Sequence, residues 1–189
     1  MRLVTPTLIT DRLRLRPVTE ADAPDIQAGF GSWAVIQHLS PKVPWPYPHD
    51  GAEQWINDHA LPAYKNETIA IWGITKSEKP NTVIGVITIR DDTGGGHRGF
   101  WLAEEHWGQG YMSEAVAAVT EWVFTETHLQ ELVAYNSVVN IRSRKVKIKT
   151  GAEFVQSVEL LHHNGETMGE MWRLTKESWR LRQSANKDQ

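Results

Sequence analysis

The stretch that decides the fold reads Gly99-Phe100-Trp101-Leu102-Ala103-Glu104-Glu105-His106-Trp107-Gly108-Gln109-Gly110-Tyr111-Met112-Ser113-Glu114-Ala115. Its first residues predict a β-strand, and apolar residues from Met112 onward recur at helical spacing, which predicts an amphipathic helix over about 109–127. Gly108 and Gly110 lie in the turn between the two elements. Alternate glycines let successive backbone N–H groups point into one concavity, and the helix adds its positive N-terminal end. The stretch therefore predicts a cradle for a pyrophosphate group.

The segments on either side predict a mixed α/β domain. Apolar and β-branched runs predict strands, and Asn164-Gly165 predicts that the last two strands form a hairpin. Thr19 with Asp22 three residues later resembles a capping box that begins a helix, and Gly151 ends another. The Pro-rich segment 41–48 is expected to be irregular, and 91–96 a turn. The expected strands are 13–17, 68–75, 82–89, 99–103, 132–136, 154–161 and 168–174, and the other helices are 19–30, 50–60 and 140–149.

Composition narrows the class of protein. The chain has 189 residues, of which 40% are hydrophobic and nine are Trp, so it is expected to form one folded domain over 1–183 with a flexible polar tail at 184–189. The net charge of -3 argues against a nucleic-acid partner. No apolar run is long enough to span a membrane, and the N-terminus has no signal-peptide core, so a cytoplasmic location is expected. The absence of Cys excludes disulfides and a cysteine nucleophile.

Four segments match, in order, the motifs of one known family. They are Thr10–Pro17 followed by Thr19–Asp22, Trp101-Leu102 followed by Trp107–Ala115, Asn140–Ser143 with Lys149-Thr150-Gly151, and Leu174–Trp179. Through these motifs the chain resembles the GNAT superfamily of N-acetyltransferases, in its RimJ/RimL-like branch. The resemblance extends over about 8–179, which is nearly the whole chain.

This resemblance implies the GNAT fold, in which helices flank a central mixed β-sheet. It also implies acetyl-CoA as a co-substrate, bound without a metal in a gap between the strand that ends near Leu102 and the strand that ends near Asn136. The amides from Gly108 to Ser113 would bind the pyrophosphate, and Asn140 the pantetheine arm or nearby backbone. The expected acetyl-CoA contacts are Leu102, Trp107, Gly108, Gln109, Gly110, Tyr111, Met112, Ser113, Asn140 and Ser143.

Direct transfer requires a base for the amine and a proton donor for the leaving thiolate. His97 lies near the general-base position of the superfamily, and an imidazole with a pKa of ~6.5 suits that role. The alternative is a solvated His after a glycine-rich turn. Glu104, at the mouth of the cofactor loop, is the second candidate base, with a surface carboxylate as its alternative. Ser143 matches the family serine near the CoA sulfur and would donate its hydroxyl proton, unless it only bonds its own helix backbone.

Two further groups of residues have both a functional and a structural interpretation. Among the basic residues from Arg142 to Lys149, one or two are candidates for the 3′-phosphate of CoA, and the others for a solvated helix face. His162-His163 resembles the start of another acyltransferase motif, but Thr167 and Met168 replace its Asp and Gly. Consecutive strand residues point to opposite faces, so the two imidazoles do not predict a metal site. One of them is a candidate for the wall of the acceptor site.

The sequence therefore predicts an N-acetyltransferase that moves the acetyl group of acetyl-CoA directly to a primary amine. The acceptor is either a protein N-terminal α-amine, as in ribosomal-protein acetylation, or a small amine. The alternative function is a catalytically silent module that senses acetyl-CoA. No membrane partner is expected, and the sequence leaves both a monomer and a homodimer open.

Overall fold

The strands form two sheets that meet along one edge. The computed structural model describes residues 3–91 and 96–187, and side chains up to residue 185. Every described strand pair is antiparallel. The first sheet has the order β1-β2-β3-β4-β5, with bounds Leu8–Ile9, Leu13–Pro17, Ile69–Lys76, Lys79–Arg90 and Arg98–Leu102. The second has the order β6-β8-β7, with bounds Glu131–Ser137, Met168–Thr175 and Glu153–Glu159.

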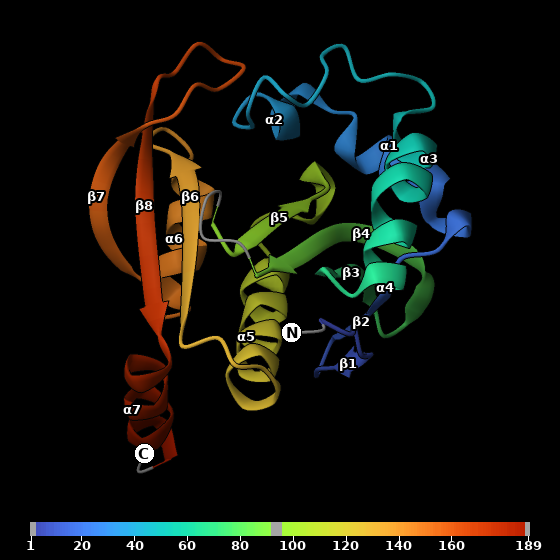
Figure 1. Ribbon diagram of the computed structural model, residues 1–189. Coiled ribbons are helices and arrows are strands. Elements are labelled where there is room, and N and C mark those ends of the chain that lie inside the picture. Colours follow the sequence, from blue (N-terminus) through green and yellow to red (C-terminus); the bar gives the residue numbers. More distant parts are fainter. Residues whose placement is uncertain (1–2, 92–95, 188–189) are drawn as a thin grey trace.

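Helices cover both faces of the five-stranded sheet (Figure 1). Consecutive strand residues point to opposite faces, so Ile71 packs against the N-terminal helices while Trp72 packs against α5. The Trp72 ring meets Trp122 of α5 edge-on at 5.0 Å between centroids. The helical segments are η1 Glu20–Asp22, α1 Ala23–Phe30, α2 Trp33–Ile36, α3 Gly51–Trp55, η2 Ile56–Ala60, α4 Leu61–Asn66, η3 Glu104–His106, α5 Tyr111–Glu126, α6 Ile141–Lys149 and α7 Lys176–Lys187.

The two sheets are joined at His97, immediately before β5. Its backbone N–H donates to the carbonyl oxygen of Val133 in β6 at 2.8 Å. Its ring Nδ1 accepts the Val133 N–H at 3.0 Å. Beyond this junction β5 and β6 separate, and Leu102 and Asn136 line the same cavity between them. The splayed pair of strands thus creates the site.

Most of the elements predicted from the sequence are present. Strand and helix positions agree within a few residues, and the helix predicted at 50–60 continues through η2 and α4. Four elements were not predicted: β1, the short α2, η3 and α7. Because α7 ends at Lys187, residues 184–187 are helical where a flexible tail was expected, while 188–189 and residues 92–95 of the predicted turn lie outside the described residues. None of the described helices combines the length and apolar character needed to cross a membrane.

Candidate active site

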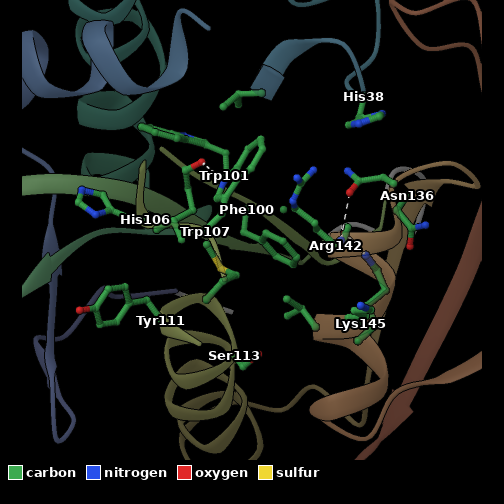
Figure 2. A pocket seen from close by; sticks show the side chains of 18 of the residues that line it. His38, Phe100, Trp101, His106, Trp107, Tyr111, Ser113, Asn136, Arg142 and Lys145 are labelled. Carbon is green, nitrogen blue, oxygen red and sulfur yellow. Dashed lines mark hydrogen bonds between the residues drawn. The ribbon is translucent and has the colours of Figure 1, made fainter. Parts of the chain in front are cut away.

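A cavity with a volume of about 560 Å³ lies between the separated strands. One side consists of β5, the glycine turn and the first turn of α5. The other consists of the end of β6 and the exposed edge of α6. Figure 2 shows Trp107, Tyr111 and Ser113 on the first side, with Asn136, Arg142 and Lys145 across from them. The cavity therefore lies between two different secondary-structure units.

The glycine turn supplies an open cradle at the N-terminus of α5. Gly108 has φ +75° and Gly110 has φ +83°, a left-handed conformation that side chains rarely adopt. A Cβ at Gly108 would meet nothing within 4 Å, so the backbone there is accessible. Gly110 is the N-cap of α5, and because glycine has no side chain, no side chain of the N-cap residue covers the helix end. The geometry and the helix dipole together suit a phosphate group.

Glu114, in the first turn of α5, anchors this cradle to the N-terminal segment. Its Oε1 accepts hydrogen bonds from the Thr10 hydroxyl at 2.6 Å and the Arg12 N–H at 3.0 Å. Its Oε2 lies 2.6 Å from Arg12 Nη2. Arg12 Nη1 also donates to the carbonyl oxygen of Gln109 at 3.0 Å, which fixes the turn itself. Sequence reasoning did not single out Glu114; an acidic residue in a first helical turn was the available signal.

The N-terminus of α6 is capped by Asn140, whose Oδ1 accepts the Ser143 N–H at 3.1 Å. This cap turns the first turn of α6 toward the cavity, so that Asn140 and Ser143 both line it. Lys147, one turn later, donates from Nζ to Ser143 Oγ at 2.7 Å. The Ser143 hydroxyl oxygen is thus engaged with a lysine side chain rather than with its own helix backbone.

The basic residues of α6 divide into two groups. Arg142, Lys145, Lys147 and Lys149 line the cavity. Arg144 instead pairs with Glu170 of β8, its Nε donating to Oε2 at 3.0 Å. Burial raises the pKa of Glu170, but the hydrogen bonds from Arg144, Asn136 and Trp172 outweigh it and hold that pKa below its ordinary value.

Most of the residues predicted to bind acetyl-CoA lie around this one cavity: Leu102, Trp107, Gly108, Gly110, Tyr111, Met112, Ser113, Asn140 and Ser143. Gln109 is not among the lining residues; its Nε2 donates to the carbonyl oxygen of Glu105 at 3.1 Å. Glu104 also lies outside the lining, on the exposed surface of η3.

The structure does not bring His97, the first candidate base, to the cavity. Its side chain is 4% exposed, and it is absent from the cavity lining. Because Nδ1 accepts the Val133 N–H, that nitrogen is not free to take a proton from a substrate. His97 is neither a base at this cavity nor the solvated residue that was the alternative. It joins the two sheets.

A different histidine, His38, does line the cavity. It follows α2, and Figure 2 places it beside Asn136, above Arg142. Within the described residues, its buried Nδ1 has no hydrogen-bond partner. Burial, then His162 and Arg142, lower the pKa of His38 below its ordinary value, which favours the neutral imidazole. Sequence reasoning missed it because α2 is four residues long and carries no motif.

A second cavity of about 450 Å³ opens beside the first. The two share Leu39, Gly99, Phe100 and Trp101, so they meet along β5. The second is walled by aromatic residues, with Tyr47 of the Pro-rich segment packed edge-on against Phe30 at 5.1 Å. Trp45, by contrast, packs against Trp33 at 5.0 Å and is absent from the lining.

The histidine pair after β7 holds the hairpin to the Pro-rich segment. The His163 ring Nε2 lies 2.6 Å from the carbonyl oxygen of Val43. His162 is buried, and its Nδ1 lies 3.1 Å from the carbonyl oxygen of Glu166. Neither lines the two cavities, and among residues 3–91 and 96–187 no cluster of three or more His, Asp or Glu side chains is arranged to hold a metal ion.

Comparison with known proteins gives the same fold. Residues 12–153 match the family described as "Acetyltransferase (GNAT) domain". An uncharacterized N-acetyltransferase of Bacillus subtilis (strain 168), YoaA, is 26% identical over 150 residues, covering 77% of this chain and 82% of that protein. The solved ribosomal-protein-S5-alanine acetyltransferase of Vibrio fischeri is similar with a TM-score of 0.77 and 18% identity, over 92% of this chain and 98% of that one. Mycobacterium smegmatis RimJ, solved in complex with CoA-disulfide, is similar with a TM-score of 0.74 and 19% identity, over 92% of this chain and 89% of that one.

Proposed function

The chain belongs to the GNAT family of acetyl-CoA-dependent N-acetyltransferases, and from this premise we propose that it transfers the acetyl group directly to a primary amine through the cavity described above. One observation carries the proposal: an open glycine cradle at the N-terminus of α5 faces the capped N-terminus of α6 across one gap. Direct transfer agrees with the absence of Cys, since no acyl-cysteine can form.

The residues present fit acetyl-CoA in their chemistry. The amides around Gly108 and Gly110 supply donors for a pyrophosphate, and Arg142 and Lys145 supply cations beside it. The pantetheine arm would lie between β5 and Asn140. Holding both substrates at the meeting point of the two cavities would supply the proximity that a bimolecular transfer needs.

The second cavity is the proposed entrance for the amine, because it reaches Gly99 and Phe100 from the other side of β5. His38 is the proposed base: it lines the first cavity, and its lowered pKa keeps the imidazole neutral, so that it can accept a proton at neutral pH. Ser143 is the proposed hydrogen-bond donor to the leaving thiolate. The acceptor is a protein N-terminal α-amine or a small amine.

A turnover assay tests this proposal. The chain is incubated with acetyl-CoA and a panel of peptides with free α-amines and of small aliphatic and aromatic amines. Released CoA is detected with a thiol reagent, and a chain without Cys adds no background. Mass spectrometry then identifies the acetamide. Release that depends on one class of amine supports the proposal, whereas acetyl-CoA binding without any amine-dependent release would support the silent sensor instead.

A further inference from the structure

The lining of the first cavity includes two buried basic side chains whose roles are not explained by the fold. Lys147 of α6 is 1% exposed, and Arg98, the first residue of β5, is 6% exposed. Both line the cavity. Within the described residues, Arg98 Nε and one terminal nitrogen, Nη1, are buried without any hydrogen-bond partner. A buried charge without a partner is unfavourable, so the unpaired nitrogens of Arg98 beside Lys147 point to a site that receives an anion.

The neighbouring carboxylate does not supply that anion. Glu170 of β8 faces Lys147, but both of its oxygens are already engaged. Oε1 accepts from Arg144, and Oε2 accepts from Arg144, Asn136 and Trp172. Arg144 therefore balances Glu170, whose oxygens are not available to Arg98 or Lys147. Phe100, whose ring centroid lies 5.4 Å from Lys147 Nζ, contributes only a π-face.

Burial and two charged groups, Arg98 and Glu170, affect the protonation of Lys147. Burial and the charge of Arg98 lower its pKa, while Glu170 raises it, and the net pKa lies well below the ordinary value for lysine. Its Nζ donates to Ser143 Oγ at 2.7 Å, so the hydroxyl proton of Ser143 points elsewhere. With its oxygen already accepting from Lys147, that hydroxyl keeps its own proton to donate to a group in the cavity that Ser143 lines.

We propose that Lys147 and Arg98 form a thiolate-binding site behind Ser143, which receives the sulfur of CoA as the acetyl group leaves. In the transfer, the bond between the carbonyl carbon and sulfur breaks, and its electron pair stays on sulfur. The Ser143 hydroxyl donates to that sulfur while Lys147 donates to Ser143 and Arg98 adds its charge. The proton lost by the acceptor nitrogen passes to the base and then to solvent. Lys147 acts through Ser143, so it is a positioning residue.

The location favours a thiolate over other anions. Lys147 is 1% and Arg98 6% exposed, so only the end of a narrow ligand such as the pantetheine arm of CoA can reach them, and this disfavours a phosphate. The second cavity, proposed for the acceptor, has neither Arg98 nor Lys147 in its lining, which disfavours a carboxylate on the amine substrate. The reaction creates one new anion, and it forms at the end of the pantetheine arm. This assignment rests on the proposed function.

Titration of the bound CoA thiol tests the assignment without knowledge of the acceptor. Thiolate absorbance at ~240 nm is recorded against pH for the CoA complex. The desulfo-CoA complex is the blank, and subtracting it removes the absorbance change that tyrosine ionisation causes. The chain has no Cys, so the remaining signal belongs to CoA. We expect the bound thiol to titrate about one pH unit or more below the ~8.5 of a free alkyl thiol, which is a tenfold change in acidity.

Lys147→Met keeps the length and apolar stem of the side chain while removing its charge, so it is expected to fold. It should return the thiol titration to that of free CoA and leave the CoA dissociation constant at low pH within a few-fold. Arg98→Met should remove part of the shift, and Lys65→Met, on the exposed end of α4, should remove none. A wild-type complex whose thiol titrates like free CoA, or a Lys147→Met complex that keeps the full shift, overturns this inference alone. Failure of CoA to bind overturns the proposed function together with it.

Discussion

The guanidinium carbon of Arg142 lies 4.4 Å from the ring centroid of Trp107, which belongs to the opposite side of the cavity. Trp107 is itself fixed, because its indole N–H donates to the carbonyl oxygen of Leu102 at 2.7 Å. The stack therefore connects the first turn of α6 to the segment that leads into the glycine cradle. A stacked guanidinium keeps its N–H edge free for an anion, so Arg142 is placed to contact a phosphate.

Replacing Arg142 tests this role. Arg142→Ala removes a cation–π contact of about 0.5–1 kcal/mol together with a charge-assisted donor, so acetyl-CoA affinity should fall roughly tenfold. Calorimetric titration at two salt concentrations measures the effect, which should shrink at high salt. Arg180→Ala, on the exposed surface of α7, is the matched control and should leave affinity unchanged. An Arg142→Ala protein with wild-type affinity would contradict the assignment.

The second prediction concerns the backbone of the cradle. Gly110 has φ +83°, whereas proline fixes φ near about -65° and has no N–H. Gly110→Pro should therefore abolish acetyl-CoA binding in a calorimetric titration. Gly110→Asn is the control, because asparagine tolerates the left-handed conformation and retains the N–H, and it should keep measurable affinity. Equal affinity in the wild type and Gly110→Pro would show that the phosphate does not bind at this turn.

The third prediction concerns the pH dependence of turnover. His38 has a pKa below its ordinary value because of burial, His162 and Arg142, so its neutral form persists to lower pH. With the best amine of the panel, kcat/KM should include an acid limb with its midpoint below about 6.5. His38→Gln should lower kcat by about 10²-fold or more and remove that limb, while acetyl-CoA affinity stays within a few-fold. An unchanged profile would assign the base to water or to another residue.

Stability should depend on an ion pair next to the first helix. Arg16 Nη2 lies 2.7 Å from Asp22 Oδ1, and the Asp22 side chain is buried. Burial raises the pKa of Asp22, but the bonds from Arg16 and Thr19 outweigh it and leave that pKa lowered. The stabilisation is therefore present above about pH 4, the unfolded value, and is lost as pH falls through the lower folded value.

Asp22→Asn should reduce the free energy of unfolding by about 3 kcal/mol at pH 7, because Arg16 loses its charged partner. Urea titration at pH 7 and near pH 3 measures the difference, which should be smaller at the acidic pH. Asp11→Asn, at an exposed position, should change little. A loss of the same size at both pH values would mean that the ion pair is not its origin.

Much of the fold could be read from the sequence because hydrophobic periodicity and glycine position are local signals. The alternation in β2 and the spacing of apolar residues in α5 each correspond to a buried face in the structure. The GNAT fold was predicted, although its strands are divided between two antiparallel sheets. The glycine turn before α5 was also predicted, and Gly108 and Gly110 both adopt positive φ there.

The parts that sequence could not supply depend on contacts between distant segments. His97 precedes β5 by one residue, and nothing local indicates that its ring accepts an N–H from Val133. His38 reaches the cavity only through the packing of a short helix. The burial of Lys147 was also unpredictable, because a basic run in a helix is usually a solvated face, and the groups beside this residue, Phe100 of β5 and Glu170 of β8, come from distant segments.

The most direct test of the central claim is a calorimetric titration of the chain with acetyl-CoA, with CoA as the control. Saturable binding of one equivalent with a micromolar dissociation constant is the predicted result, about -8 kcal/mol of binding free energy. No heat of binding at millimolar acetyl-CoA would contradict it. The gap between α5 and α6 would then not be an acetyl-CoA site.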